Sequence, residues 1–269
     1  MIGLVEELPN GVAVFQATDN DVIKSNIYCE FPWCPPDSHG FVFQQSRPED
    51  APNTREFVFC DFNTWEKRIV GHGSGDCTMS RGRLYFQRTD KKDRRELARV
   101  DLNSGEEQVW EIPDSVPITS RMGISCDERY IAYSERISWS PQRFGIGILD
   151  LHNGQTDLIC EDPWLNNSHL QFEPGKGRQL LIQHNRGSVY TPEGKCEVLV
   201  GPEGCTLFLL DVPSGKITRL PLGPPDTASC SGHEAWLGES GDVILTLNIA
   251  EDYDHGKGPI MLAKPGKAL

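Results

Sequence analysis

Several features that mark other protein classes are missing from this sequence of 269 residues. No run reaches the roughly eighteen consecutive apolar residues of a membrane-spanning helix, so no membrane span is predicted. The first residues carry no basic segment ahead of an apolar run, so no secretory signal is predicted and a cytoplasmic location is expected. Basic residues are in the minority, with 26 Lys and Arg against 39 Asp and Glu. The net charge of -13 argues against a nucleic-acid-binding or anionic-membrane surface.

Motifs of cysteine and serine chemistry are also missing. The nine cysteines form no Cys-x-x-Cys pair, so they are predicted to be reduced thiols in the core. No segment resembles Gly-x-Ser-x-Gly, which excludes the nucleophile turn of a serine hydrolase.

The sequence does contain a repeated phrase, found by searching for internal similarity. A β-rich run ends in Asp, an apolar residue and two linking residues follow, and Gly usually closes the phrase. Asp followed by a short loop and Gly is typical of a β-hairpin, here the one between the third and fourth strands of a blade. The repeated aspartates are Asp61, Asp101, Asp150 and Asp211, separated by 40, 49 and 61 residues.

These repeats predict an all-β fold, a β-propeller of four-stranded blades that forms a single domain over residues 1–269. Residues 10–18 are expected to add an outer strand to the last blade. The fifth repeat stops before its Asp phrase, so about five blades of a probable seven are expected here, with the C-terminal part incomplete. The five units are predicted at 25–71, 75–113, 118–160, 165–222 and from 228 to the end.

Three histidines between Trp164 and Trp236 are the candidate functional residues. His169 and His233 each lie five residues before the turn that opens the second strand of their unit. Equivalent positions on the inner strands of adjacent blades converge on the propeller axis, and His184 ends a second strand near the same mouth. Strand histidines in β proteins are more often structural than ligands, so that alternative stays open for all three.

The segments around these histidines resemble those of one known family. Trp164-Leu-Asn-Asn-Ser-His169, Gln183-His184-Asn-Arg-Gly and Ser229-Cys-Ser-Gly-His233-Glu-Ala-Trp are similar to Trp-Leu-Gly-His, Cys-His-Glu-Gly and Cys-Thr-His-Glu-Phe-Trp of the oligogalacturonate lyases. Those enzymes are seven-bladed propellers. The resemblance implies that His233 is a manganese ligand and that His169 takes part in the chemistry. The family's Gln-x-x-His-x-His segment, which supplies its other ligands, has no counterpart here, so about two blades are expected to be absent.

The implied reaction is β-elimination on a short uronate-containing oligosaccharide. A base must remove the proton next to a carboxylate, and Mn²⁺ or arginine must stabilise the charge that develops. His169 and Arg143 are the predicted catalytic residues, and His184, Arg186 and Arg121 are predicted to bind substrate, since guanidinium pairs with carboxylate. Glu234 is expected to be structural, because strand alternation turns it away from His233.

A second hypothesis is a non-catalytic propeller that binds a protein or a carbohydrate, comparable to Tol-type or oligopeptidase propellers. A chain that truly ends at Leu269 is predicted to be inactive as a lyase, because one histidine does not hold manganese tightly.

Overall fold

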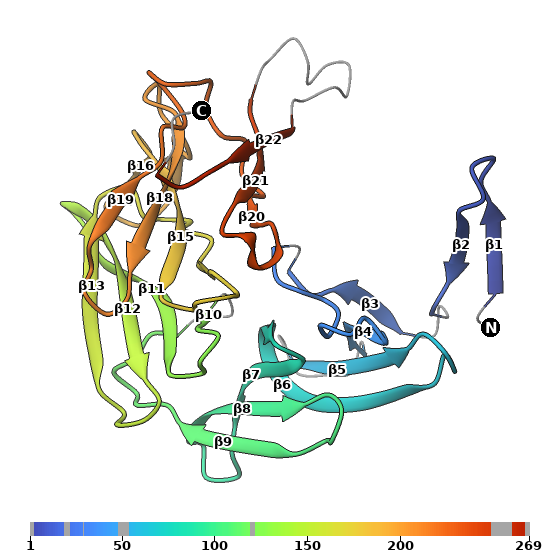
Figure 1. The fold of residues 1–269 in the computed structure, drawn as a ribbon. Helices are drawn as coiled ribbons and strands as arrows, with labels where there is room; N and C mark the ends of the chain where they lie inside the picture. Colours follow the sequence, from blue (N-terminus) through green and yellow to red (C-terminus); the bar gives the residue numbers. More distant parts are fainter. Residues whose placement is uncertain are drawn as a thin grey trace. The chain divides into compact units, whose positions relative to one another are not determined.

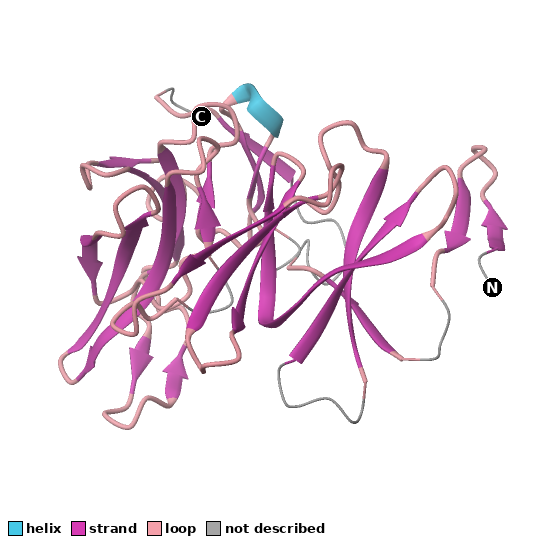
Figure 2. Cartoon of the chain, turned by 90° about the horizontal axis from the view of Figure 1, so that it is seen from below, coloured by secondary structure: helices cyan, strands magenta, loops and turns pink. Residues whose placement is uncertain are grey.

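The computed structural model describes residues 3–18, 22–28, 30–47, 54–118, 122–248 and 260–266. Almost all regular structure in these ranges is antiparallel β-sheet, and the one helical element is a 3-10 turn, η1 (Gly238–Ser240) (Figure 2). Within the described ranges, no helix is long and apolar enough to span a membrane. The chain divides into two compact units, Met1–Ile112 and Pro113–Leu269.

The first unit contains a seven-stranded antiparallel sheet in which two blades share one long strand (Figure 1). The pairing of that strand, β6, shifts register between Ser74 and Cys77, where it passes from the outer edge of one blade to the inner position of the next. The expected boundary between the first two units, at residues 71 to 75, therefore coincides with a bulge in a continuous strand. The strands in order are β3 (Ile23–Asn26), β4 (Gly40–Ser46), β5 (Thr54–Asp61), β6 (Lys67–Ser80), β7 (Arg83–Thr89), β8 (Arg95–Asp101) and β9 (Glu107–Glu111).

The N-terminal residues form a separate hairpin. β1 (Gly3–Glu7) and β2 (Ala13–Gln16) pair with each other in a two-stranded sheet, with every residue of both strands exposed. The strand expected over residues 10–18 is thus present as β2, and β1 is its partner within the first unit. A nearby turn at Asn10 and Gly11 gives it a local partner, which sequence periodicity alone did not reveal.

The second unit holds two complete four-stranded blades and a three-stranded sheet (Figure 1). The first blade is β10 (Gly123–Ile124), β11 (Tyr130–Trp139), β12 (Gln142–Asp150) and β13 (Thr156–Asp162). The second is β14 (Gln171–Phe172), β15 (Gln179–Asn185), β18 (Cys205–Asp211) and β19 (Ile217–Arg219), with the hairpin β16 (Val189–Tyr190) and β17 (Cys196–Val198) inserted. The third sheet is β20 (Ala235–Trp236), β21 (Val243–Thr246) and β22 (Ile260–Ala263).

Apolar side chains on both faces of these sheets pack against the neighbouring sheets. Leu180 and Ile182 of β15 lie in a core shared with Ile146 of β12, whereas Leu181 between them lies in a second core with Val243 of β21. Because successive side chains of a strand point to opposite faces, one blade can bury apolar residues against both neighbours. This arrangement confirms the propeller-type architecture predicted from the repeats.

The repeated aspartates close the hairpin between the third and fourth strands, as predicted. In three repeats the Gly amide four residues later donates to the Asp backbone carbonyl at 2.8 Å. These glycines have φ between 70° and 76°, which costs little without a Cβ. In the first repeat Trp65 takes this place with φ 58° and makes the same 2.8 Å bond to Asp61. The three glycines are Gly105, Gly154 and Gly215.

Candidate functional site

His169 and His233 lie in equivalent places in consecutive sheets of the second unit. Each lies two residues before an inner strand, β14 or β20, and each has a positive φ, 47° and 60° respectively. Their ring centroids are 6.2 Å apart with the planes inclined by 35°. The expected equivalence is therefore observed, although both residues precede the strands instead of lying inside them.

Two hydrogen bonds hold the segments of these histidines side by side. The Gln171 side-chain amide donates to the Glu234 carbonyl at 2.7 Å, and the Trp236 indole donates to the Gln171 carbonyl at 3.0 Å. Both bonds involve Gln171, the first residue of β14, and they reach residues on either side of Ala235, the first residue of β20. The short inner strands are thereby fixed by side chains as well as by their ladders.

Glu234 belongs to this cluster, which sequence reasoning missed. Its side chain is fully buried, and Oε1 lies 3.6 Å from Nδ1 of His169. In the described part of the chain, neither carboxylate oxygen has a hydrogen-bond partner. The expectation that strand alternation makes Glu234 purely structural is wrong in its premise, because the left-handed conformation at His233 interrupts the alternation before β20 starts.

These side chains suit a hard or borderline divalent cation. A buried carboxylate without hydrogen-bond donors is costly unless a positive charge compensates it. Carboxylate oxygen and imidazole nitrogen are both ligands that Mn²⁺ accepts, although ligand type alone does not select the metal. Nδ1 of His169 and Oε1 of Glu234, 3.6 Å apart, therefore fit the implied manganese better than the single histidine expected from the sequence.

His184 lies near the end of β15 and is held on several sides. Its Nε2 is 2.8 Å from Oδ1 of Asp162, and its ring contacts those of Trp164 and Phe208, each at 5.7 Å between centroids. Burial alone raises the pKa of Asp162, but the His184 hydrogen bond and the Trp164 amide outweigh it, so the pKa lies below its usual value. The imidazole thus ties the outer strand β13 to β15 across two blades.

The predicted arginines Arg143 and Arg186 each bind groups of the protein itself. Arg143, at the start of β12, pairs with Glu161 of β13, with Nε 2.6 Å from Oε1. The guanidinium of Arg186 donates to the carbonyls of Gly204 at 3.1 Å, Pro224 at 2.7 Å and Glu203. Arg121 lies outside the described residues.

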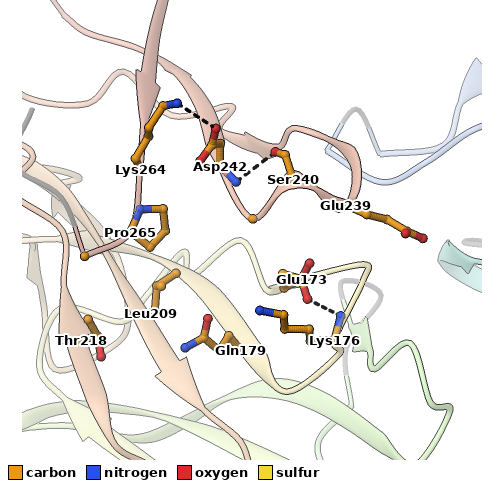
Figure 3. Close-up of a pocket in the computed structure, with 12 residues that line it drawn as sticks. Glu173, Lys176, Gln179, Leu209, Thr218, Glu239, Ser240, Asp242, Lys264 and Pro265 are labelled. Atoms are coloured by element: carbon orange, nitrogen blue, oxygen red, sulfur yellow. Dashed lines mark hydrogen bonds and ion pairs between the residues drawn. The ribbon is translucent and has the colours of Figure 1, made fainter.

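A pocket of about 480 Å³ lies at the other ends of the two inner strands. It is lined by the β14–β15 turn with Glu173 and Lys176, by the β20–β21 turn with Asp242, and by residues 264–266 (Figure 3). Nζ of Lys264 lies 3.6 Å from Asp242, and Glu173 accepts hydrogen bonds from the amides of its own turn. Because the histidines precede β14 and β20 and the pocket follows them, the two features are separate.

No family model matches this chain, and no curated protein matches it either. Among solved structures, the oligogalacturonate lyase of Vibrio parahaemolyticus superposes with a TM-score of 0.66 at 17% identity, over 98% of this chain and 69% of that one. An oligogalacturonate lyase in complex with manganese gives 0.62 at 19%, over 93% and 70%. The β-propeller domain of the Trilobed protease from Pyrococcus furiosus gives 0.55 at 14%, over 95% and 73%. At such identities the likeness concerns the fold, and it establishes that this chain has a β-propeller fold.

Proposed function

We propose that this protein cleaves short uronate-containing oligosaccharides by metal-assisted β-elimination, with His169, His233 and Glu234 at the reacting centre. The observation that carries the proposal is the pairing of two imidazoles, 6.2 Å apart, at equivalent places in consecutive sheets. A buried carboxylate beside them adds a site for a cation. The fold shared with oligogalacturonate lyases supports the same conclusion.

The reaction needs a base, a stabiliser of negative charge and a proton for the leaving group. The base takes the proton from the carbon next to the uronate carboxylate, the glycosidic C–O bond at the neighbouring carbon breaks, and a C=C bond forms. The departing sugar oxygen receives a proton. Bound Mn²⁺ would lower the energy of the enolate-like charge that develops on the carboxylate.

Metal binding and proton transfer are divided between the two histidines. The resemblance assigns the metal to His233 and proton transfer to His169, and Arg143 is proposed as a second catalytic residue. A neutral imidazole can perform either task, since it offers a lone pair for a metal or a proton.

Substrate binding is proposed for His184, Arg186 and Arg121. The first two already have partners within the protein, so their side chains must exchange those contacts to reach a uronate carboxylate. Arg143 faces the same requirement, because it is paired with Glu161. A substrate carboxylate would then replace Glu161 in a comparable ion pair.

The test is the rise in ultraviolet absorbance from the unsaturated uronide when the full-length protein receives oligogalacturonate and Mn²⁺. His169→Asn and His233→Asn are expected to abolish the rise, whereas His152→Gln, in an exposed turn, should leave it unchanged. No rise with the wild-type protein, under conditions where a known lyase responds, overturns the proposal.

The alternative is a propeller that binds a protein or a carbohydrate without catalysis. It is favoured by the likeness to TolB from Acinetobacter baumannii, with a TM-score of 0.54 at 12% identity over 85% of this chain and 53% of that one. Such a protein would bind its partner with no absorbance change and no dependence on Mn²⁺.

A further inference from the structure

We propose that Glu234 and His169 together bind a divalent cation, which leaves the exposed His233 to transfer the proton. This exchanges the two roles that the resemblance assigns. The catalytic half of the inference rests on the proposed lyase function, whereas cation binding by Glu234 and His169 stands without it.

Glu234 supplies the first argument. Its side chain is 0% exposed, and neither oxygen has a hydrogen-bond partner within the described ranges. An ionised carboxylate in that setting is shielded from bulk solvent and has no donor among the described residues, whereas a buried charge is normally paired or bound to a metal. Glu173, another buried carboxylate, accepts a bond from the amide of Gly175 and, as Figure 3 shows, one from the amide of Lys176, and so needs no cation.

The spacing of the two groups supplies the second argument. The 3.6 Å between Nδ1 of His169 and Oε1 of Glu234 exceeds the roughly 2.7–3.2 Å of an N–H···O hydrogen bond. Two ligand atoms that each lie about 2.1 Å from one divalent cation are about 3–3.5 Å apart. The pair is therefore spaced more like two ligands of one ion than like a donor and its acceptor.

The orientation of the His169 ring sets a condition for cation binding. Nδ2 of Asn167 lies 2.8 Å from Nε2 of His169, so in this arrangement the amide donates to Nε2 and the ring proton is on Nδ1. Cation binding at Nδ1 requires the Asn167 amide to turn over, so that its oxygen accepts a proton from Nε2–H. The lone pair of the ring is then on Nδ1, facing Glu234, and metal-binding histidines are commonly oriented by a hydrogen bond of this kind.

Exposure separates the two histidines. His169 is 8% exposed, whereas His233 is an exposed residue. A ligand gains from burial, because water competes less for the cation, whereas a proton-transfer residue must reach the substrate. The buried imidazole beside the carboxylate thus suits metal binding, and the exposed one suits contact with the sugar.

The experiment is a titration of the chelator-treated full-length protein with Mn²⁺, followed by calorimetry and by the electron paramagnetic resonance of free Mn²⁺. Glu234→Gln and His169→Asn are compared with two matched controls, His233→Asn and Glu173→Gln. We expect wild type to bind one Mn²⁺ per chain, and the first two variants to bind at least about tenfold more weakly. The controls should stay within about twofold of wild type.

A second measurement does not depend on the Glu234 variant. The electron spin echo of bound Mn²⁺ should show coupling to a ¹⁴N nucleus in wild type and in His233→Asn, and lose it in His169→Asn. The inference is overturned if wild type binds no Mn²⁺ saturably, if Glu234→Gln binds as wild type does, or if the nitrogen coupling vanishes with His233 instead. Because no sugar is present, a protein that binds Mn²⁺ as expected but cleaves nothing contradicts only the proposed function.

Discussion

His169 and His233 adopt the same left-handed backbone conformation at the same point, two residues before the inner strands of consecutive sheets. Left-handed φ is unfavourable for most residues, and histidine is among those that adopt it more readily. Because the two residues share this conformation, their imidazoles lie in the same region, with the ring centroids 6.2 Å apart. The strain is thus located where the proposed chemistry occurs.

The backbone conformation at His233 predicts an unusual order of stabilities. His233→Gly should be more stable than His233→Ala by about 1 kcal/mol, because glycine avoids the steric cost of Cβ at positive φ. Urea unfolding of the two variants measures the difference. Equal stability, or a more stable Ala variant, would show that this residue is not left-handed in solution.

Removing the charge of Glu234 should stabilise the metal-free protein. With a chelator present, Glu234→Gln is expected to raise the free energy of unfolding by about 1–3 kcal/mol, because an uncompensated buried carboxylate is lost. Saturating Mn²⁺ should then raise the melting temperature of wild type more than that of the variant. Glu173→Gln serves as the opposite control and should be destabilised, since its carboxylate binds two turn amides.

The Asp162–His184 pair predicts a dependence of stability on pH. The pKa of Asp162 is below its unfolded value of 3.8, so the ionised form stabilises the folded protein. That contribution is fully present above about pH 4 and is lost as the pH falls through the lowered folded pKa. The stability gap between wild type and Asp162→Asn, measured by urea unfolding, should therefore shrink on acidification. A gap that widens would contradict the assigned hydrogen bond.

Arg186 allows structural and substrate roles to be separated. Arg186→Lys should lower the free energy of unfolding by about 1–3 kcal/mol, because lysine cannot donate to three carbonyls with the arginine geometry. Thermal unfolding and the Michaelis constant for oligogalacturonate are measured on the same preparation. A large rise in that constant without a loss of stability would favour the predicted substrate role over the structural one.

The buried thiols should resist modification. Hydrogen bonding with Cys230 and burial both raise the pKa of Cys205, which keeps its thiol protonated at neutral pH. Iodoacetamide is therefore expected to label the exposed Cys196 quickly and Cys205 and Cys230 only after unfolding. Mass spectrometry of digests gives the order of labelling, and early labelling at Cys205 would rule out the packed, protected state predicted for its thiol.

The repeats along the chain predicted the all-β fold and the position of its turns from the sequence alone. The Asp phrases predicted the hairpin between third and fourth strands, because Asp and Gly determine that turn through local hydrogen bonds. They also predicted where the blades lie along the sequence and that His169 and His233 occupy equivalent positions. These features depend on near neighbours in the chain, which is why periodicity and turn chemistry sufficed.

Other features were decided by the tertiary structure. The environment of Glu234 depends on His169, 65 positions away in the sequence, and on a left-handed residue that breaks strand alternation. Likewise, the sequence did not predict the partners of Arg186 and His184. Arg186 binds backbone carbonyls and His184 binds a carboxylate, all from distant segments. The sequence alone determined the blades and where the histidines lie along them, because local chemistry sets turns and strands. Only packing between blades decided which polar groups face each other, because those contacts join residues far apart in the chain.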